Sequence, residues 1–223
     1  MVIQGVLWDM DGVLVDTGEF HYQAWTKTLS EYDIPYSYEL FLETFGMNNR
    51  GILIKLMGYE PDQQFQEKVS NQKEEIFRKI IQGNARPLPG VVETLGLIRS
   101  KGIRQAIASS APPENIELLV DTLNLRDSFD AIVSGYGLSG KPAPDVFLAA
   151  AEAIGIPAEL CLVVEDAVTG VEGAKRAGMR CLAVTNTNPA QKLQQADYIV
   201  DSLLQIKPGF LEEILGSAPG NSK

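Results

Sequence analysis

Two aspartates stand at the end of an apolar, strand-type run near the start of the chain. Residues 6–8 lead into Asp9, Asp11 follows two positions later, and Gly12 then allows the backbone to turn. Carboxylates at the exit of a buried strand cost free energy unless a cationic group lies beside them. The pattern therefore indicates either a chemical site or an acidic turn after a strand, and Asp-x-Asp alone leaves both interpretations open.

Three further stretches end in residues that could join the same chemistry. Ser109 and Ser110 follow one apolar run, Lys141 follows a glycine-rich loop, and Glu165 and Asp166 follow another apolar run. Each of these signals is weak by itself. Together they predict one composite site, because ligands of parallel sheets bind at the carboxyl ends of the strands.

The spacing of apolar residues predicts such a sheet. Short apolar runs alternate with amphipathic stretches, which is typical of a parallel sheet covered on both faces. Strands are predicted over residues 2–8, 104–108, 131–133, 160–164, 180–184 and 196–200. Helices are predicted over residues 91–100, 114–123, 145–154 and 168–177. Residues 17–86 show helical spacing and no convincing strand, so we interpret them as a helical insertion.

The residue types at the strand ends favour a site for a phosphoryl group. Four acids gather there: Asp9, Asp11, Glu165 and Asp166. They could not all stay ionised without cations, and an all-oxygen set of ligands favours a hard ion, Mg²⁺ above others. Lys141 adds a fixed positive charge and Ser109 a hydroxyl donor. One carboxylate could attack phosphorus to form an aspartyl-phosphate, and another could transfer protons.

These residues resemble the four motifs of the haloacid dehalogenase superfamily. In chain order they are Asp9-x-Asp11-Gly12-Val13, Ser109, Lys141-Pro142 and Glu165-Asp166. The resemblance covers the chain to about Pro208, and residues 17–86 resemble the cap that subfamily I inserts after the first motif. It implies an α/β fold with a Rossmann-like parallel-sheet core, residues 1–16 and 87–223, and an inserted α-helical cap domain, residues 17–86.

The resemblance also implies a catalytic role for each motif. Asp9 would be the nucleophile and Asp11 the general acid/base. Ser109 would hydrogen-bond the phosphoryl oxygens, and Lys141 would neutralise the nucleophile and the phosphate. Because true dehalogenases and phosphonatases lack an acid at the position of Asp11, the resemblance implies phosphoryl chemistry instead of carbon–halogen or carbon–phosphorus cleavage.

The same resemblance implies a Mg²⁺ site. Asp9 and Asp166 would bind the metal through their carboxylates, and Asp11 through its main-chain carbonyl. Glu165 would be either an alternative ligand or a residue behind the ligands. All four residues are therefore expected at the metal.

Four more residues are candidates for binding the substrate: His21, Arg50, Lys73 and Ser110. Residues 16–25 resemble the hinge and first cap helix of β-phosphoglucomutases, where a His assists cap closure and proton transfer. A partly buried structural role is the alternative for His21. Lys73 resembles a cap lysine of both mutases and phosphatases, or else lies on a solvated helix face.

Residues 46–51 resemble the substrate-specificity loop of the cap. In the mutases an Arg stands three positions after the Gly, where this chain has Asn49, and Arg50 comes one position later. This departure favours a phosphatase. Arg50 is interpreted either as a substrate contact or as a solvated residue at a helix start.

Two enzymatic functions fit the motifs. The preferred hypothesis is a Mg²⁺-dependent phosphatase of small phosphorylated metabolites, in particular sugar phosphates, with a cap that closes over the substrate. The alternative is a β-phosphoglucomutase, which interconverts β-glucose 1-phosphate and glucose 6-phosphate through the same aspartyl-phosphate. A non-catalytic protein that kept the fold is disfavoured, because acids stand at all the motif positions that need them.

The composition narrows the possible partners and location. The 223 residues include 19 Lys or Arg and 29 Asp or Glu, and the net charge of −10 disfavours nucleic acid or an anionic membrane as a partner. No apolar stretch reaches the roughly 18–20 residues that span a bilayer, and no signal-peptide pattern precedes the first strand. Cys161 and Cys181 are expected to be reduced and buried, which predicts a cytoplasmic protein. The oligomeric state stays open, with a monomer favoured.

Overall fold

A parallel β-sheet forms the centre of the molecule. The computed structural model describes residues 2–216, and within them six strands form one sheet in the order β3-β2-β1-β4-β5-β6. All neighbouring strands are parallel. The strands are β1 (Gly5–Trp8), β2 (Arg104–Ser109), β3 (Ala131–Ser134), β4 (Cys161–Glu165), β5 (Arg180–Val184) and β6 (Tyr198–Val200). The predicted α/β class with a Rossmann-like parallel sheet is confirmed.

The strand order places the first strand beside both halves of the sheet. β1 pairs with β2 on one side and with β4 on the other, so the sheet is built outward from β1 in two directions. At such a switch point the connections diverge and leave a crevice at the carboxyl ends of the strands. Trp8, Ser109 and Glu165 are the last residues of β1, β2 and β4, and they mark the edge at which the crevice lies.

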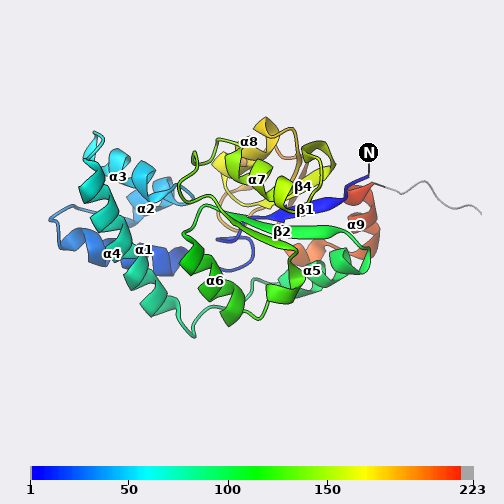
Figure 1. Cartoon of the computed structure of the whole chain (residues 1–223), viewed down its shortest axis with the longest axis horizontal. Coiled ribbons are helices and arrows are strands. Elements are labelled where there is room, and N and C mark those ends of the chain that lie inside the picture. The colour runs from blue at the N-terminus through cyan, green and yellow to red at the C-terminus, as the bar shows by residue number, and fades with distance from the viewer. Residues whose placement is uncertain (1, 217–223) are drawn as a thin grey trace, which may run out of the picture.

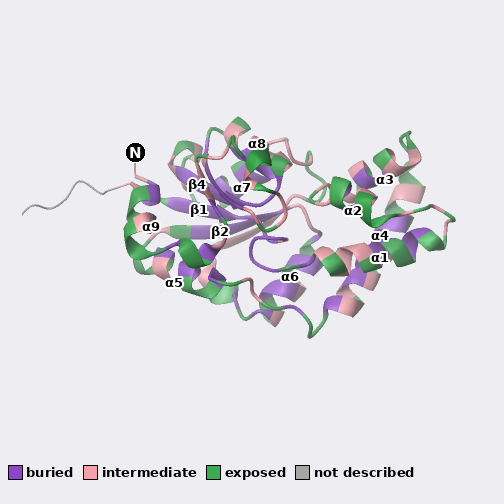
Figure 2. Ribbon diagram, turned by 180° about the vertical axis from the view of Figure 1, so that it is seen from behind, coloured by how far each residue is buried: buried purple, intermediate pink, exposed green. Residues whose placement is uncertain are grey.

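Helices cover both faces of the sheet (Figure 1). The core helices are α5 (Val91–Ser100), α6 (Pro113–Thr122), α7 (Asp145–Ala153), α8 (Val168–Arg176) and α9 (Pro208–Leu215). Helices α5, α6 and α9 pack with Val6 and Trp8 of β1, whereas α7 and α8 pack with Leu7 on the other face. The central strands are therefore buried on both faces (Figure 2), which is why their sequences are continuous apolar runs.

A group of four helices lies at one end of the sheet (Figure 1). They are α1 (Gly18–Ser30), α2 (Tyr38–Thr44), α3 (Asn49–Met57) and α4 (Gln63–Ile81). The last three begin after a residue whose side chain accepts a backbone N–H of the first turn, namely Ser37, Asn48 and Asp62. The group has a small apolar core of its own, formed by Trp25, Leu29, Ile52, Leu53 and Val69. We call these helices the cap; the exact domain boundaries at 16/17 and 86/87 stay a prediction.

The chain leaves the sheet domain and returns to it at adjacent points. Val15 and Pro87 form an isolated antiparallel bridge, and the Leu88 N–H donates to the Leu14 carbonyl at 3.0 Å. The C-terminal part of α4 also reaches the main core, where Phe77 is buried. Because the two segments that connect the sheet domain with the cap lie side by side, any hinge motion of the cap is confined to a few residues.

One helix of the core was not predicted from the sequence. Helix α9 packs Leu211, Ile214 and Leu215 into the same apolar cluster as α5. Pro208 at its first turn is a recognisable helix start in the sequence. The other elements agree with prediction to within a few residues, the largest difference being that β1 begins at Gly5 instead of residue 2.

Two expectations from composition can be compared with the structure. Cys161 and Cys181 are both buried and unpaired, as expected. Among residues 2–216, no helix combines the length and the apolar character that crossing a membrane would require.

Candidate active site

Three carboxylates and a lysine converge at the carboxyl end of the sheet. Asp9 follows β1, while Glu165 ends the neighbouring strand β4 and Asp166 comes next. Lys141 reaches them from the loop after β3, and its Nζ donates to Asp9 Oδ1 at 2.5 Å and to Glu165 Oε1 at 2.6 Å. All four side chains are buried. The sheet thus brings together side chains that come from distant parts of the sequence.

Burial shifts the protonation of this group. It raises the pKa of Asp9 to about 8, against the opposing charge of Lys141 and with a further rise from Glu165 and Asp11. Burial likewise raises the pKa of Asp166, with Glu165 and Asp9 contributing. For Lys141, burial would lower the pKa, but Asp9 and Glu165 outweigh it and raise the pKa. A single lysine therefore leaves the acids short of positive charge, which a bound cation would supply.

The residues present fit a magnesium ion. One oxygen from each of Asp9, Glu165 and Asp166 lies within 4.8 Å of the others, and an all-oxygen set suits a hard divalent cation. Gly12 leaves the space that this arrangement needs, because a Cβ there would lie 2.0 Å from Asp166 Oδ2. The carboxylate of Asp11 is not part of the group; the predicted contribution of its main-chain carbonyl stays a prediction.

Glu165 is held by contacts on both of its oxygens. Its Oε1 accepts from Lys141, and its Oε2 accepts the backbone N–H groups of Asp166 and Ala167, each at 2.7 Å. Gly170 of helix α8 packs directly against it, since a Cβ at that position would lie 1.7 Å from Glu165 Oε1. These contacts fit a residue that orients Lys141 and the turn to Asp166, the second of the two roles expected for Glu165.

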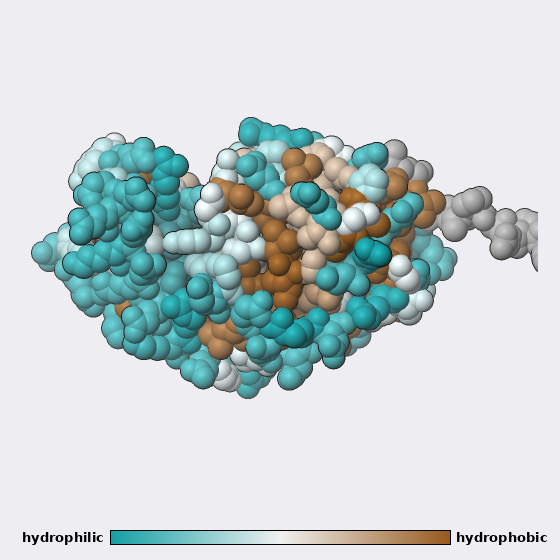
Figure 3. Space-filling model, in the orientation of Figure 1, coloured by the Kyte–Doolittle hydropathy of each residue, from teal (hydrophilic) through white to brown (hydrophobic). Residues whose placement is uncertain are grey.

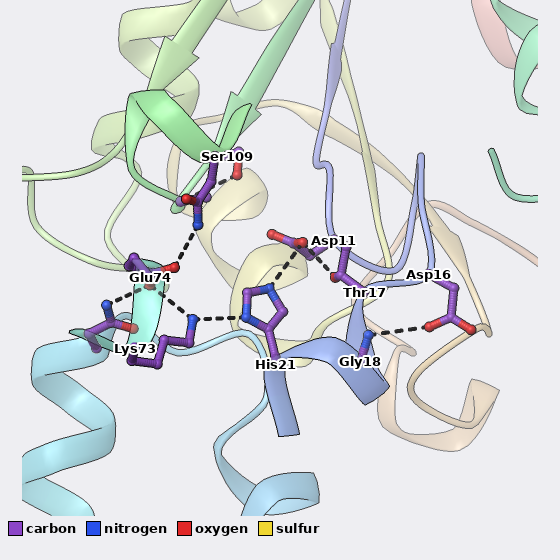
Figure 4. Close-up of polar contacts among 11 residues, drawn as sticks. Asp11, Asp16, Thr17, Gly18, His21, Lys73, Glu74 and Ser109 are labelled. Carbon is purple, nitrogen blue, oxygen red and sulfur yellow. Dashed lines mark hydrogen bonds and ion pairs between the residues drawn. The ribbon is translucent and has the colours of Figure 1, made fainter. Parts of the chain in front are cut away.

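The second aspartate of the first motif has a different environment. Asp11 Oδ1 accepts from the Thr17 hydroxyl at 2.5 Å and lies 3.3 Å from His21 Nε2 (Figure 4). Burial would raise the pKa of Asp11, but His21 and Thr17 together lower it below its ordinary value. Two carboxylates separated by one residue thus have opposite pKa shifts, which suits separate tasks for them.

A largely buried polar chain leads from Asp11 into the cap. His21 stacks on Phe77 with ring centroids 4.1 Å apart, and its Nδ1 lies 2.8 Å from Lys73 Nζ. Lys73 is 2% exposed and also donates to Glu74 Oε1 at 2.9 Å (Figure 4). The interpretation of Lys73 as part of a solvated helix face is therefore wrong, because α4 turns this side toward α1, where Lys73 Nζ lies 5.5 Å from the centre of the Trp25 ring, and Glu74 balances its charge.

The remaining predicted residues lie in three different settings. Ser109 is fully buried at the end of β2, where its Oγ accepts the Ala111 N–H at 3.1 Å. Ser110 lines the pocket between cap and core. Arg50 lies on the same pocket's wall, but its exposed guanidinium pairs with Glu60, with Nε 2.9 Å from Oε1. Ser109 is not among the residues that line this pocket, in contrast to Ser110 and Arg50.

The cap and the core enclose a cavity of about 560 Å³. Its core side includes Asp9, Asp11 and Lys141, and its cap side includes His21 and the rings of Trp25, Phe41 and Phe45. Figure 3 shows hydrophilic residues over most of the cap surface and an indentation where the cap meets the core. The cap closes tightly at this edge, since a Cβ on Gly140 would lie 2.4 Å from Asn48 Nδ2 of the cap.

Sequence reasoning missed a further strand end beside the acids. After β5, the Thr187 hydroxyl donates to Asp166 Oδ2, and the Asn188 side chain donates to the Asp166 carbonyl at 3.1 Å. Asn186 Nδ2 donates to the Gly12 carbonyl at 2.8 Å. The polar run after an apolar strand was the signal that could have revealed these residues, as it did for the other strand ends.

Comparison with known proteins agrees with this geometry. Residues 3–178 match the family model described as haloacid dehalogenase-like hydrolase. The chain belongs to this family. A phosphorylated carbohydrates phosphatase of Thermotoga maritima is 31% identical over 220 residues, 96% of this chain and 97% of the relative. A β-phosphoglucomutase of Bacillus subtilis is 30% identical over 220 residues, 95% of each chain.

A solved structure and a longer relative extend the comparison. The crystal structure of a β-phosphoglucomutase from Clostridium difficile has a TM-score of 0.85 and 25% identity, covering 95% of this chain and 96% of the other. The chloroplast protein SUPPRESSOR OF QUENCHING 1 of Arabidopsis thaliana is 33% identical over 198 residues, 83% of this chain, which spans only 18% of that protein. The family and these relatives show that the chain is a phosphoryl-transfer enzyme of the hydrolase class.

Proposed function

We propose that the chain is a Mg²⁺-dependent phosphatase of small phosphorylated metabolites, sugar phosphates in particular, which acts through an aspartyl-phosphate on Asp9. The observation that carries the proposal is the contrast between the two aspartates. Asp9 lies against Lys141 among oxygen ligands, whereas Thr17 and His21 hold Asp11 apart from that group. One acid is thus available for attack and the other for proton transfer.

Four residues of the chain have separate parts in this reaction. A carboxylate oxygen of Asp9 attacks phosphorus, the bond from phosphorus to the leaving oxygen breaks, and Asp11 protonates that oxygen. Asp11 then takes a proton from water, which attacks phosphorus and releases phosphate from Asp9. Lys141 neutralises charge at Asp9, and Ser109 is assigned to the phosphoryl oxygens. The negative charge of an arriving phosphate favours the protonated form of Asp11 that the first step needs.

The metal would be held by this chain's own acids. Asp9 and Asp166, with the main-chain carbonyl of Asp11, are the proposed ligands, and Thr187 orients Asp166. When bound, Mg²⁺ would neutralise the charge that gathers on the phosphoryl oxygens. This accounts for a cluster of buried acids whose pKa values are raised in the protein alone.

The closed cap suits a small substrate. A cavity of about 560 Å³ lies within the usual range for small-molecule sites. His21, Lys73 and Arg50 of the cap, with Ser110 of the core, are the proposed contacts for the rest of the substrate. The cavity also contains apolar rings, which exclude water from the reacting atoms.

The mutase is the alternative, and two observations bear on it. The His21 contact with Asp11 agrees with the resemblance to mutase hinges, and the Bacillus subtilis relative is a β-phosphoglucomutase. A mutase must also hold a second phosphate in the cap. Here Asn49, at the mutase arginine position, donates to Glu74 at 2.7 Å, and Arg50 pairs with Glu60. This arrangement favours the phosphatase.

The test is a Mg²⁺-dependent assay with p-nitrophenyl phosphate and a panel of sugar phosphates that includes β-glucose 1-phosphate. Steady release of inorganic phosphate that stops with EDTA is the expected result. Formation of glucose 6-phosphate without net phosphate release would replace the phosphatase with the mutase. Turnover that does not respond to EDTA would remove the metal from the proposal.

We further propose that the protein works in the cytoplasm, without nucleic-acid or membrane partners, and as a monomer. The charge of −10 supports the absence of polyanionic partners. Size-exclusion chromatography with light scattering gives the oligomeric state directly, and a dimer mass would contradict the monomer.

A further inference from the structure

Glu74 is the junction of three separate parts of the molecule. Its Oε1 accepts from Lys73 at 2.9 Å and from Asn49 Nδ2, at the start of α3, at 2.7 Å. Its Oε2 accepts from Asn115 Nδ2 of the core helix α6 at 2.6 Å. Glu74 is 5% exposed, so this carboxylate depends on its protein partners instead of water. No motif of the sequence pointed to it.

The bond to Asn115 connects the cap to the core. Asn115 is 1% exposed, and its other side-chain atom, Oδ1, accepts from Arg78 Nη1 at 2.9 Å. Glu74 and Arg78 lie one turn apart on α4, so the amide of Asn115 fits between an acceptor and a donor on the same helix face. This fit fixes which end of the amide faces each partner.

The two ends of the polar chain lie in the core and its middle lies in the cap. Asp11 contacts His21 at one end, and Asn115 contacts Glu74 at the other, with Lys73 between them. Moving the cap away from the core would break both end contacts. A buried carboxylate that loses a partner is destabilised, so the closed arrangement is favoured at Glu74 itself.

We propose that Glu74 is a positioning residue that fastens the closed cap to the core through Asn115 and holds Lys73 against His21 beside Asp11. The proposal deepens the proposed function, because it names a residue of the pocket wall that supports the acid/base through Lys73. The Oε2 side serves closure, and the Oε1 side serves the placement of Lys73.

Three variants separate these two tasks. Asn115→Asp places a second carboxylate against Glu74 and should open the cap. Glu74→Gln removes the charge that faces Lys73 and also mismatches the contact with Asn115. The double variant E74Q/N115D restores a donor–acceptor pair between cap and core, with Arg78 now facing an acid, but leaves Lys73 without its partner charge.

Closure is measured on the whole free protein by small-angle X-ray scattering, which needs no activity. We expect a larger radius of gyration for Asn115→Asp than for wild type, and a wild-type value for the double variant. An unchanged radius in Asn115→Asp, or an open double variant, would overturn the assignment of closure. Glu75→Gln is the matched control, because Glu75 is exposed on the same helix and pairs with Lys79.

Kinetics with p-nitrophenyl phosphate report the second task. We expect Asn115→Asp to raise KM about tenfold, and the double variant to regain the wild-type KM while kcat stays about tenfold low. Recovery of both constants in the double variant would contradict the placement of Lys73 by Glu74. Absence of turnover in the wild type would refute the proposed function, whereas the scattering results would still decide the role of the Glu74–Asn115 contact.

Discussion

At the scale of single residues, the site depends on different surroundings for similar side chains. Asp9 and Asp166 are raised in pKa by burial, whereas the contacts of Asp11 with His21 and Thr17 lower its pKa. Glu165 accepts hydrogen bonds on both oxygens, from Lys141 on one and from the backbone N–H of Asp166 on the other. The residue types are therefore less informative than the partners that the fold gives to each of them.

The first prediction concerns the nucleophile. Asp9→Asn keeps the shape of the side chain but removes the attacking carboxylate, so we expect at least about 1,000-fold lower kcat for phosphate release. The fold should persist, because Lys141 keeps its contact with Glu165. Circular dichroism and a melting curve provide the control. Near-wild-type turnover in this variant would remove Asp9 from its role.

The second prediction concerns the metal. Asp166→Ala removes a proposed ligand, so the Mg²⁺ concentration for half-maximal activity should rise by about 100-fold or more. Thr187→Val removes only the hydroxyl that orients Asp166 and should raise the same concentration by about tenfold. Mg²⁺ titration of activity measures both. An identical titration curve for Asp166→Ala would take Asp166 off the set of ligands.

At the scale of helices and strands, close packing around the strand ends keeps these partners in place. Parallel strands deliver Asp9 and Glu165 to the same edge, and the loops and helices that follow must then fit around buried acids. Gly12 and Gly170 provide that fit, because a side chain at either position would collide with an acid. Helix α8 thus supports the site through a residue with no functional group.

The third prediction tests this packing with two glycines in helices. Gly170→Ala should displace Glu165 and cost about 2–4 kcal/mol of unfolding free energy, together with most activity. Gly96→Ala, in the exposed part of α5 where a Cβ meets nothing within 4 Å, should stabilise by about 0.5–1 kcal/mol. Urea unfolding measures both changes. A neutral Gly170→Ala would show that α8 adjusts to the added methyl group.

At the scale of the whole molecule, the cap and the core share one polar chain. Burial would raise the pKa of Glu74, but Lys73, His21 and Asn49 outweigh burial and lower it. A carboxylate with a lowered pKa in the folded protein contributes stability that is complete above its unfolded pKa and is lost as pH falls through the folded one. The cap–core connection should therefore weaken in acid.

The fourth prediction follows from the lowered pKa of Glu74. The difference in unfolding free energy between wild type and Glu74→Gln should be constant above about pH 5 and should shrink below about pH 4. Urea unfolding at a series of pH values measures it. Glu75→Gln serves as the comparison, since Glu75 is exposed and its pairing with Lys79 is open to solvent screening. A difference that does not vary with pH would mean that Glu74 is not held in its ionised form.

Much of the fold and the central acids could be predicted from sequence, because their signals are local. Apolar runs form buried strands, and polar residues directly after them must reach the carboxyl edge of a parallel sheet. Asp9 and Asp166 follow this rule, and Lys141 stands at the end of the glycine-rich loop after β3. Helix α9 and Thr187 also have local signals, namely a proline at a helix start and a polar run after an apolar strand.

The cap side of the site was decided only by the tertiary structure. A helix sequence does not reveal which of its charged residues faces another domain, so Lys73 is compatible with a solvated face until α4 is packed. Arg50 forms an ion pair with Glu60, and Asn49 donates a hydrogen bond to Glu74. Glu74 also accepts a hydrogen bond from Asn115 across the cap–core contact. These partners are distant in sequence, and their meeting depends on how the cap is placed against the core. Local patterns thus determined where the chemistry lies, whereas long-range packing decided how the cap is held over it.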